Sequence, residues 1–170
     1  IYVNNYNQAG YHKIFNNIIY GINEGMRLDT NYPAYVYNNT VANCSIGINS
    51  PYNKVVAKNN IAYNNTDNYL GTFDASSTNN LSGPGSDAQI PPTGARNGVT
   101  VTFVNPSGSP PNFHLDALFD TGAKDYGANL SSDPNLAIST DIDGETRAAP
   151  WDIGADECVI TVTLSEASIG

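Results

Sequence analysis

Two groups of ionisable residues have a spacing that could support chemistry. The first group, Glu24, Arg27 and Asp29, lies close together in the N-terminal part of the chain. In an extended strand Arg27 and Asp29 would point to the same side, because side chains alternate with a period of two. Polysaccharide lyases need a base beside carboxylates, and glycosidases need a pair of carboxylates at a suitable separation. The group is therefore a catalytic candidate, although we favour the alternative interpretation of a solvated strand face.

The second group is acidic and lies near the C-terminus. Asp141, Asp143 and Asp152 are spaced so that a turn could gather their carboxylates, and Asp-x-Asp-Gly occurs in calcium-binding loops. The full calcium-loop pattern, which ends in a Glu at a fixed spacing, is absent. We therefore favour a structural corner, in which the carboxylates accept backbone N–H bonds and Arg147 pairs with one of them. Calcium is the alternative, and no other cofactor is expected.

The remaining chemical residues form no familiar motif. The sequence has no Gly-rich phosphate loop, no Ser-His-Asp arrangement of note and no zinc-binding spacing. His12 and His114 are isolated, and we interpret His114 as a strand residue rather than a ligand or a base. A disulfide between Cys44 and Cys158 is possible in a secreted protein, and the sequence leaves their pairing open.

The composition excludes some classes of partner. Seven Lys and Arg residues stand against sixteen Asp and Glu residues, which gives a net charge of −9. Binding to nucleic-acid phosphates requires a basic surface, so we expect no nucleic-acid partner. No stretch is long and apolar enough to cross a membrane. A polar surface that is rich in Tyr and Asn suits neutral carbohydrate.

A repeat in the first half of the chain predicts the elements that position these residues. Asn-Asn pairs occur at 16–17, 38–39, 59–60 and 79–80, so that the second Asn advances by 22, 21 and 20 residues. Short apolar segments flank each of the first three pairs. A period of about 20 residues is typical of a solenoid. Short apolar pairs with Asn and Gly between them indicate strands and turns rather than helices.

The repeat predicts an all-β fold, a right-handed, single-stranded parallel β-helix with about three short strands in each coil. Equivalent residues would stack about 4.8 Å apart. Two interior columns would be Ile14, Val36 and Ala57, and Ile19, Val41 and Ala62. Asn17, Asn39 and Asn60 would form a ladder at a bend, because Asn tolerates the left-handed conformation and its amide can bond along the column. Cys44 would be a buried apolar residue of the second coil.

We divide the chain into three parts. Residues 1–82 are expected to form coils of the β-helix, beginning with the tail of a preceding coil. Residues 83–157 are expected to form a loop-rich last coil and a C-terminal capping segment, with Trp151 and Ile153 covering the end of the solenoid. Residues 158–170 would be a tail or the start of a following domain. The chain is thus interpreted as the C-terminal portion of a longer protein with further coils and domains.

Five short motifs follow one another in the last part of the chain: residues 103–106 (FVNP), 112–115 (NFHL), 120–122 (DTG), 141–147 (DIDGETR) and 151–157 (WDIGADE). Their order resembles the C-terminal segment of bacterial secreted right-handed parallel β-helix proteins, which are often described as pectate-lyase-like or as choice-of-anchor proteins. With the repeats, the resemblance covers most of residues 13–157. It departs from the family at 116–120, where a Ser-Pro-Ala-Ile-Asp type of run would be expected. It implies the fold and a secreted or cell-surface location, but not a reaction.

These observations favour a binding function over a catalytic one. We expect the C-terminal part of an extracellular β-helix protein that binds polysaccharide or another surface glycan without chemistry of its own. Tyr35, Tyr37 and Tyr52 are the candidate sugar contacts. The first alternative is a fragment of a polysaccharide lyase or glycosidase whose active coils lie largely upstream. The second is a fragment of a phage tail-spike, which would be trimeric; the sequence does not identify the sugar or its linkage.

Overall fold

The computed structural model describes residues 1–6 and 9–159 of the chain. These residues contain fourteen β-strands and no helix. They therefore contain no helix that is long and apolar enough to span a membrane. Most of the expected C-terminal tail, residues 160–170, lies outside the described part.

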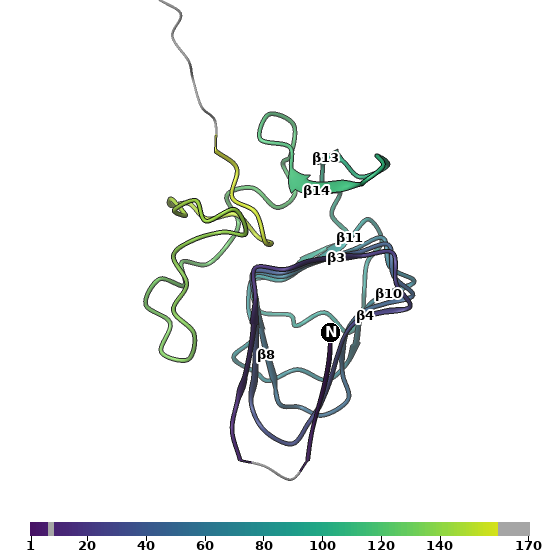
Figure 1. The fold of residues 1–170 in the computed structure, drawn as a ribbon, viewed down its shortest axis with the longest axis vertical. Helices are drawn as coiled ribbons and strands as arrows, with labels where there is room; N and C mark the ends of the chain where they lie inside the picture. Colours follow the sequence, from purple (N-terminus) through teal and green to yellow (C-terminus); the bar gives the residue numbers. More distant parts are fainter. Residues whose placement is uncertain (7–8, 160–170) are drawn as a thin grey trace, which may run out of the picture.

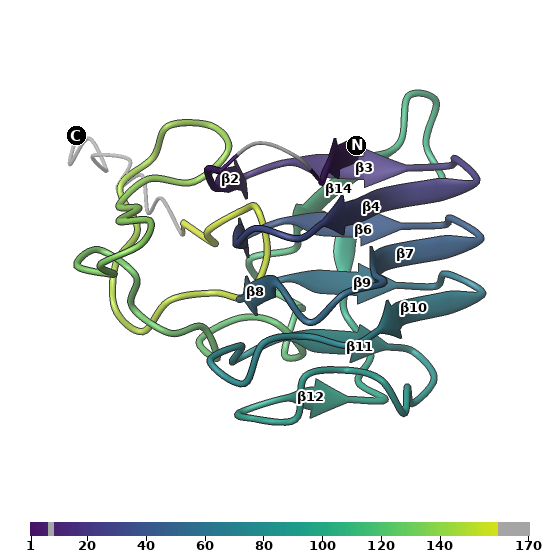
Figure 2. The same cartoon turned by 90° about the horizontal axis from the view of Figure 1, so that it is seen from below.

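Three parallel sheets stack the strands of successive coils, as Figures 1 and 2 show. Sheet A contains β1 (Tyr2–Asn5), β4 (Glu24–Thr30), β7 (Ile46–Ser50) and β10 (Asp67–Gly71). Sheet B contains β2 (His12–Phe15), β5 (Ala34–Tyr37) and β8 (Val55–Lys58). Sheet C contains β3 (Ile18–Tyr20), β6 (Thr40–Ala42), β9 (Ile61–Tyr63), β11 (Leu81–Gly83) and β12 (Arg96–Asn97). Each complete coil passes through sheets B, C and A in turn, so the predicted parallel β-helix is confirmed.

Strand register confirms both interior columns, which are Ile14–Val36–Ala57 in sheet B and Ile19–Val41–Ala62 in sheet C. The columns pack together in one apolar core inside the coils, and Met26, Leu28 and Ile48 of sheet A complete it. Full burial of a side chain of this size contributes about 1.5–3 kcal/mol to stability. Cys44 is buried beside this core, as expected, and both Cys44 and Cys158 are free thiols.

A ladder of asparagine side chains runs along the corner between sheets B and C. The Nδ2 of Asn17 donates to Oδ1 of Asn39 at 2.9 Å, and the same bond joins Asn39 to Asn60 at 3.0 Å and Asn60 to Asn80 at 2.9 Å. Each Oδ1 also accepts the backbone N–H of the ladder asparagine in the preceding coil, at 3.1 Å in every step. The predicted ladder is confirmed, and it extends one coil further, to Asn80.

The left-handed conformation at this corner belongs to the first asparagine of each pair, where the sequence analysis assigned it to the second. The φ angle is 52° at Asn16 and Asn38 and 53° at Asn59 and Asn79. The short polar side chain of Asn tolerates this region better than other side chains do. One asparagine therefore makes the bend, and its neighbour makes the ladder.

The bend asparagines also hold the C-terminal segment, residues 123–158, against the side of the coils. Asn16 Nδ2 donates to the carbonyl of Thr140 at 2.8 Å, and Asn79 Nδ2 donates to that of Tyr126 at 3.0 Å. Asn59 exchanges two hydrogen bonds with the backbone of Ala128, both 2.8 Å long. The segment thus follows the corner from the later coils back to the earlier ones, as Figure 2 shows in yellow and green.

Trp151 and Ile153 do not cover the last coil, so this expectation is wrong. Trp151 packs against Tyr37 and Val56 on the outward face of sheet B, and Ile153 packs with Ile61 on the outward face of sheet C. Solenoids normally cover their open ends, which is why a capping role was expected. Here outward apolar side chains on the middle coils provide the surface that the segment buries.

A hairpin covers the rest of sheet C. Strands β13 (Phe103–Asn105) and β14 (Asn112–Leu115) pair antiparallel to each other. The ring of Phe103 meets that of Tyr63 edge to face at 5.4 Å, and Phe113 lies 5.2 Å from Tyr20. The hairpin and the C-terminal segment therefore form an outer layer over sheets B and C.

We predict that Asn39→Ala strongly destabilises the protein. The substitution leaves the backbone N–H of Asn17 without its acceptor, and it removes the Nδ2 donor from Asn60 Oδ1 and from the carbonyls of Ile14 and Tyr37. One backbone donor left unsatisfied costs about 1–3 kcal/mol, and the lost side-chain bonds add to this, so we expect the free energy of unfolding to fall by about 2–4 kcal/mol. Urea unfolding followed by fluorescence measures the change.

The matched control is Asn31→Ala, because Asn31 is exposed. Exposed substitutions usually change stability by less than about 0.5 kcal/mol. Equal losses in Asn39→Ala and Asn31→Ala would contradict a stabilising role for the ladder.

Candidate functional site

The outer face of sheet A brings the first ionisable group together. Arg27 and Asp29 flank the fully buried Leu28 on β4, so both point outward. Arg27 Nε donates to Asp29 Oδ2 at 2.8 Å, and Arg27 Nη1 lies 3.6 Å from Glu24 Oε1. The three residues that the sequence analysis selected therefore form one ionic group bridged by Arg27.

Strands on both sides add polar groups to this cluster. Asn49 of β7 is in register with Arg27, and its Nδ2 donates to Glu24 Oε1 at 2.6 Å. Tyr2 of β1 is in register with Arg27 on the other side, and its hydroxyl donates to Asp29 Oδ2 at 3.2 Å. Amide and phenol groups, rather than further acids, thus stack on the ionic group.

Three exposed tyrosines lie on one side of the ionic group: Tyr2 bonds Asp29, Tyr6 lies near both, and Tyr52 contacts Tyr6. Tyr2 is 61% exposed, Tyr6 38% and Tyr52 42%. The rings of Tyr6 and Tyr52 meet edge to face, with centroids 5.9 Å apart. The hydrogen bond with Tyr52 and the charge of Asp29 raise the pKa of Tyr6 to about 12. We call this surface the sheet A site, and it consists of Tyr2, Tyr6, Glu24, Arg27, Asp29, Asn49 and Tyr52.

The structure places the three expected sugar contacts in different surroundings. Tyr52 lies in the sheet A site, whereas Tyr35 is half-buried on sheet B with its ring 6.1 Å from that of Tyr11. Tyr37 is fully buried under the C-terminal segment, and its hydroxyl lies 3.4 Å from Asp133 Oδ1. Tyr37 therefore has no ring face available to a sugar.

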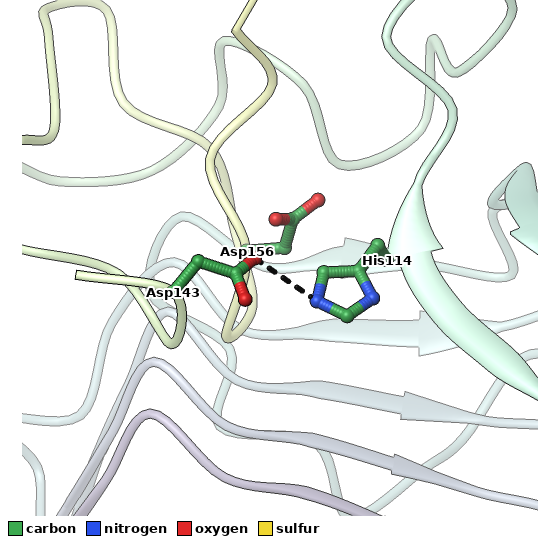
Figure 3. Close-up of side chains that lie close together, drawn as sticks. All are labelled: His114, Asp143 and Asp156. Atoms are coloured by element: carbon green, nitrogen blue, oxygen red, sulfur yellow. Dashed lines mark ion pairs between the residues drawn. The ribbon is translucent and has the colours of Figure 1, made fainter. Parts of the chain in front are cut away.

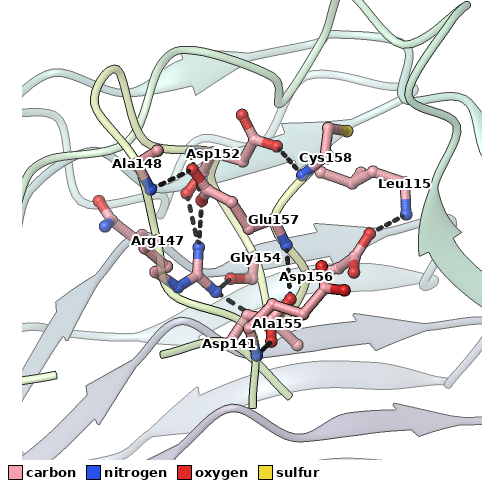
Figure 4. Close-up of polar contacts among 12 residues, drawn as sticks. Leu115, Asp141, Arg147, Ala148, Asp152, Gly154, Ala155, Asp156, Glu157 and Cys158 are labelled. Atoms are coloured by element: carbon pink, nitrogen blue, oxygen red, sulfur yellow. Dashed lines mark hydrogen bonds and ion pairs between the residues drawn. The ribbon is translucent and has the colours of Figure 1, made fainter. Parts of the chain in front are cut away.

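Asp141 and Asp152 hold the backbone of the C-terminal segment, as Figure 4 shows. Three backbone N–H groups donate to the carboxylate of Asp141, at 2.9, 3.0 and 3.2 Å. Two donate to that of Asp152, at 2.6 and 2.7 Å. Asp143 differs from them, because its side chain is exposed and contacts His114 instead. The three aspartates considered for calcium thus have separate surroundings.

Arg147 is a buried residue of the C-terminal segment, and its side chain holds other parts of the segment together (Figure 4). Its side chain is buried, and Nη1 forms an ion pair with Glu157 Oε2 at 2.9 Å. Its Nη2 donates to the carbonyls of Gly154 and Ala155, at 2.7 and 2.9 Å. The expected partner was an aspartate, but backbone N–H groups already occupy the oxygens of Asp141 and Asp152. Glu157 takes that place, and burial raises its pKa to about 7.

A second cluster joins residues that the sequence analysis did not connect. His114, Asp143 and Asp156 form the one group of three potential metal ligands among the described residues. His114 alternates with the buried Phe113 and Leu115 on β14, and this alternation is the sequence signal that it faces away from the core. The spacing from His114 to the two aspartates matches no motif, so only the fold could bring them together.

We predict that Arg147→Ala lowers stability much more than an exposed arginine substitution. Removing one partner of a buried ion pair typically costs about 3–5 kcal/mol, because the other charge is left buried. Arg27→Ala is the control, because the side chain of Arg27 is 41% exposed, and we expect a smaller loss there although its partner Asp29 is buried. Thermal unfolding followed by circular dichroism compares them, and similar midpoints would contradict the prediction.

We predict that Tyr6 stays protonated near about pH 11, where an ordinary tyrosine with a pKa of about 10 is mostly ionised. Tyr52→Phe removes the hydrogen bond and should return the pKa of Tyr6 toward the ordinary value. NMR of the labelled Tyr6 ring measures the titration. Tyr11→Phe, on the other side of the β-helix, should leave it unchanged. Ordinary titration of Tyr6 in the unsubstituted protein would mean that the tyrosine cluster is not assembled.

No protein-family model matches the chain, and neither a curated protein nor a solved structure matches it. The resemblance of the C-terminal motifs to pectate-lyase-like and choice-of-anchor proteins therefore gains no support from these comparisons. The chain shares the parallel β-helix architecture with such proteins, and architecture alone does not determine function.

Proposed function

We propose that the chain is an extracellular β-helix module that binds neutral polysaccharide through the sheet A site. The observation that carries this proposal is the group of three exposed tyrosines beside the Arg27–Asp29 pair. Tyrosine offers an apolar ring for stacking and a hydroxyl for hydrogen bonding. The adjacent amide, carboxylate and guanidinium groups can donate to and accept from sugar hydroxyls.

The shape and charge of the surface support this class of ligand. A hollow of about 320 Å³ opens between Ile1, Tyr2, Glu24 and Arg27, at the edge of the tyrosine cluster. The net charge of −9 disfavours a polyanionic chain, since like charges repel over the surface. A neutral polysaccharide meets no such repulsion. The resemblance to secreted β-helix proteins supports a location outside the cell.

Binding fits the site better than cleavage does. Hydrolysis needs two carboxylates that face one glycosidic bond across an open space. Arg27 bridges Glu24 and Asp29 and contacts both of their carboxylates. Asn49 and Tyr2 bond the same two acids. The ionic group therefore serves to hold Tyr2 and to offer polar contacts.

We predict that Tyr52→Ala weakens polysaccharide binding about 2- to 12-fold, which corresponds to the energy of one aromatic contact, about 0.5–1.5 kcal/mol. Affinity electrophoresis in gels that contain xylan or mannan measures the change, and pectin and alginate serve as polyanionic comparisons. Tyr11→Ala is the control, because Tyr11 is also exposed, at 63% compared with 42% for Tyr52, and lies beside sheet B, away from the sheet A site. Equal weakening by the two substitutions, or tighter binding of the polyanions, would contradict the proposed site.

The same preparation tests the enzyme alternative. We expect no new unsaturated or reducing ends when the protein is incubated with xylan, pectin, alginate or glycosaminoglycans, with or without calcium. Turnover that disappears in Arg27→Ala or Glu24→Gln would replace the binding proposal with a lyase or hydrolase.

A further inference from the structure

Three side chains from separate parts of the chain converge beside the hairpin, as Figure 3 shows. His114 comes from β14, Asp143 from a turn, and Asp156 from the end of the C-terminal segment. Their potential ligand atoms all lie within 4.8 Å of one another, and His114 Nε2 is 3.1 Å from Asp143 Oδ2. The cluster lies away from the sheet A site, and none of its members takes part in the proposed glycan contacts.

The imidazole of His114 is oriented by a hydrogen bond on its other nitrogen. His114 Nδ1 lies 2.6 Å from Asn112 Oδ1, which also accepts the backbone N–H of His114 at 2.9 Å. An amide oxygen only accepts, so Nδ1 carries a proton, and Nε2 is the ring nitrogen that faces the carboxylates and is placed to bind a metal ion. Histidines that ligate metals are usually held in this way, through an N–H donated to an oxygen.

Of the two carboxylates, that of Asp156 is held in place and that of Asp143 is free to move. Asp156 is 8% exposed, and its Oδ2 accepts the backbone N–H of Leu115 at 2.7 Å. Asp143 has a side chain that is 56% exposed and lies next to Gly144 in a turn. A ligand could therefore draw Asp143 inward without disturbing the core.

Charge favours a divalent ion at this position. A protonated His114 would supply one positive charge against two carboxylates, and Asp141 adds a further negative charge nearby. Arg147, the closest buried cation on the same segment, already pairs with Glu157. A divalent cation with a neutral imidazole would balance both carboxylates.

We propose that His114, Asp143 and Asp156 bind one divalent transition-metal ion of the zinc type, with a water molecule as the fourth ligand. Zinc takes nitrogen and oxygen ligands at about 2.0–2.2 Å, so neighbouring ligand atoms in a tetrahedron lie about 3.3–3.5 Å apart. The 3.1 Å between His114 and Asp143 is close to this spacing. Imidazole favours zinc, copper or nickel, whereas calcium prefers oxygen ligands alone. The ion would join the hairpin to the C-terminal segment.

Titration of the chelator-treated, metal-free protein with Zn²⁺ tests the proposal. Calorimetry should show one equivalent bound, and the unfolding midpoint should rise by about 5–10 °C at a Zn²⁺ concentration about 100 times the Kd. The ¹⁵N signal of His114 Nε2 should shift on addition of the metal. Ca²⁺ at the same concentration should produce none of these effects.

Four variants decide where the ion binds. Asp143→Asn changes an exposed side chain and should reduce Zn²⁺ affinity at least about 10-fold with unchanged folding, and His114→Ala should abolish the midpoint shift. His12→Ala removes the other histidine and should bind as the unsubstituted protein does. Cys158→Ser should also bind normally. The proposal would be overturned if the protein binds no stoichiometric Zn²⁺, or if Asp143→Asn and His114→Ala bind Zn²⁺ as tightly as the unsubstituted protein does. Loss of binding in Cys158→Ser would also overturn it.

Discussion

Paired asparagines at one corner of the coil determine much of this structure. A corner interrupts the strand pairing, so buried backbone donors need other acceptors. The fully buried ladder residues Asn39, Asn60 and Asn80 provide them, since each of their Oδ1 atoms accepts one backbone and one side-chain N–H from the preceding coil. Their neighbours Asn16, Asn59 and Asn79 make the left-handed bend and bond the C-terminal segment. One dipeptide thus fixes the stacking of the coils and the position of the layer outside them.

The interior of the β-helix could be predicted from the sequence, but its covering could not. The period of the repeat states which residues stack, so the columns of Val36 and Val41 and the ladder of Asn39 followed from it. The repeat carries no information about the outer face of a coil. Tyr37 looked like a surface tyrosine because the residue that contacts its hydroxyl, Asp133, lies 96 positions further along. Trp151 was assigned to the open end because nothing in the repeat links it to Tyr37 and Val56, with which it packs on the outer face of sheet B.

The candidate sites show the same division. Arg27 and Asp29 share one strand, so the two-residue period was enough to place them on one face. Tyr2 lies on β1 and Tyr6 directly follows that strand, and they were not connected with Arg27 and Asp29 because this preceding coil carries no asparagine repeat in phase. His114 lies 29 and 42 positions before Asp143 and Asp156, a separation that only the folding of the C-terminal segment back along the corner can close.

The course of the C-terminal segment has a consequence for how such a protein can evolve. Solenoids commonly lengthen or shorten by duplication or deletion of whole repeats, because each repeat contacts only its neighbours. Here Tyr126, Ala128 and Thr140 meet asparagines of three different coils in reverse order. An added or lost coil between Asn16 and Asn79 would displace these contacts by one strand spacing, about 4.8 Å. The length of the segment therefore restricts the number of coils between Asn16 and Asn79, so coils cannot be added or lost there unless the segment also changes in length.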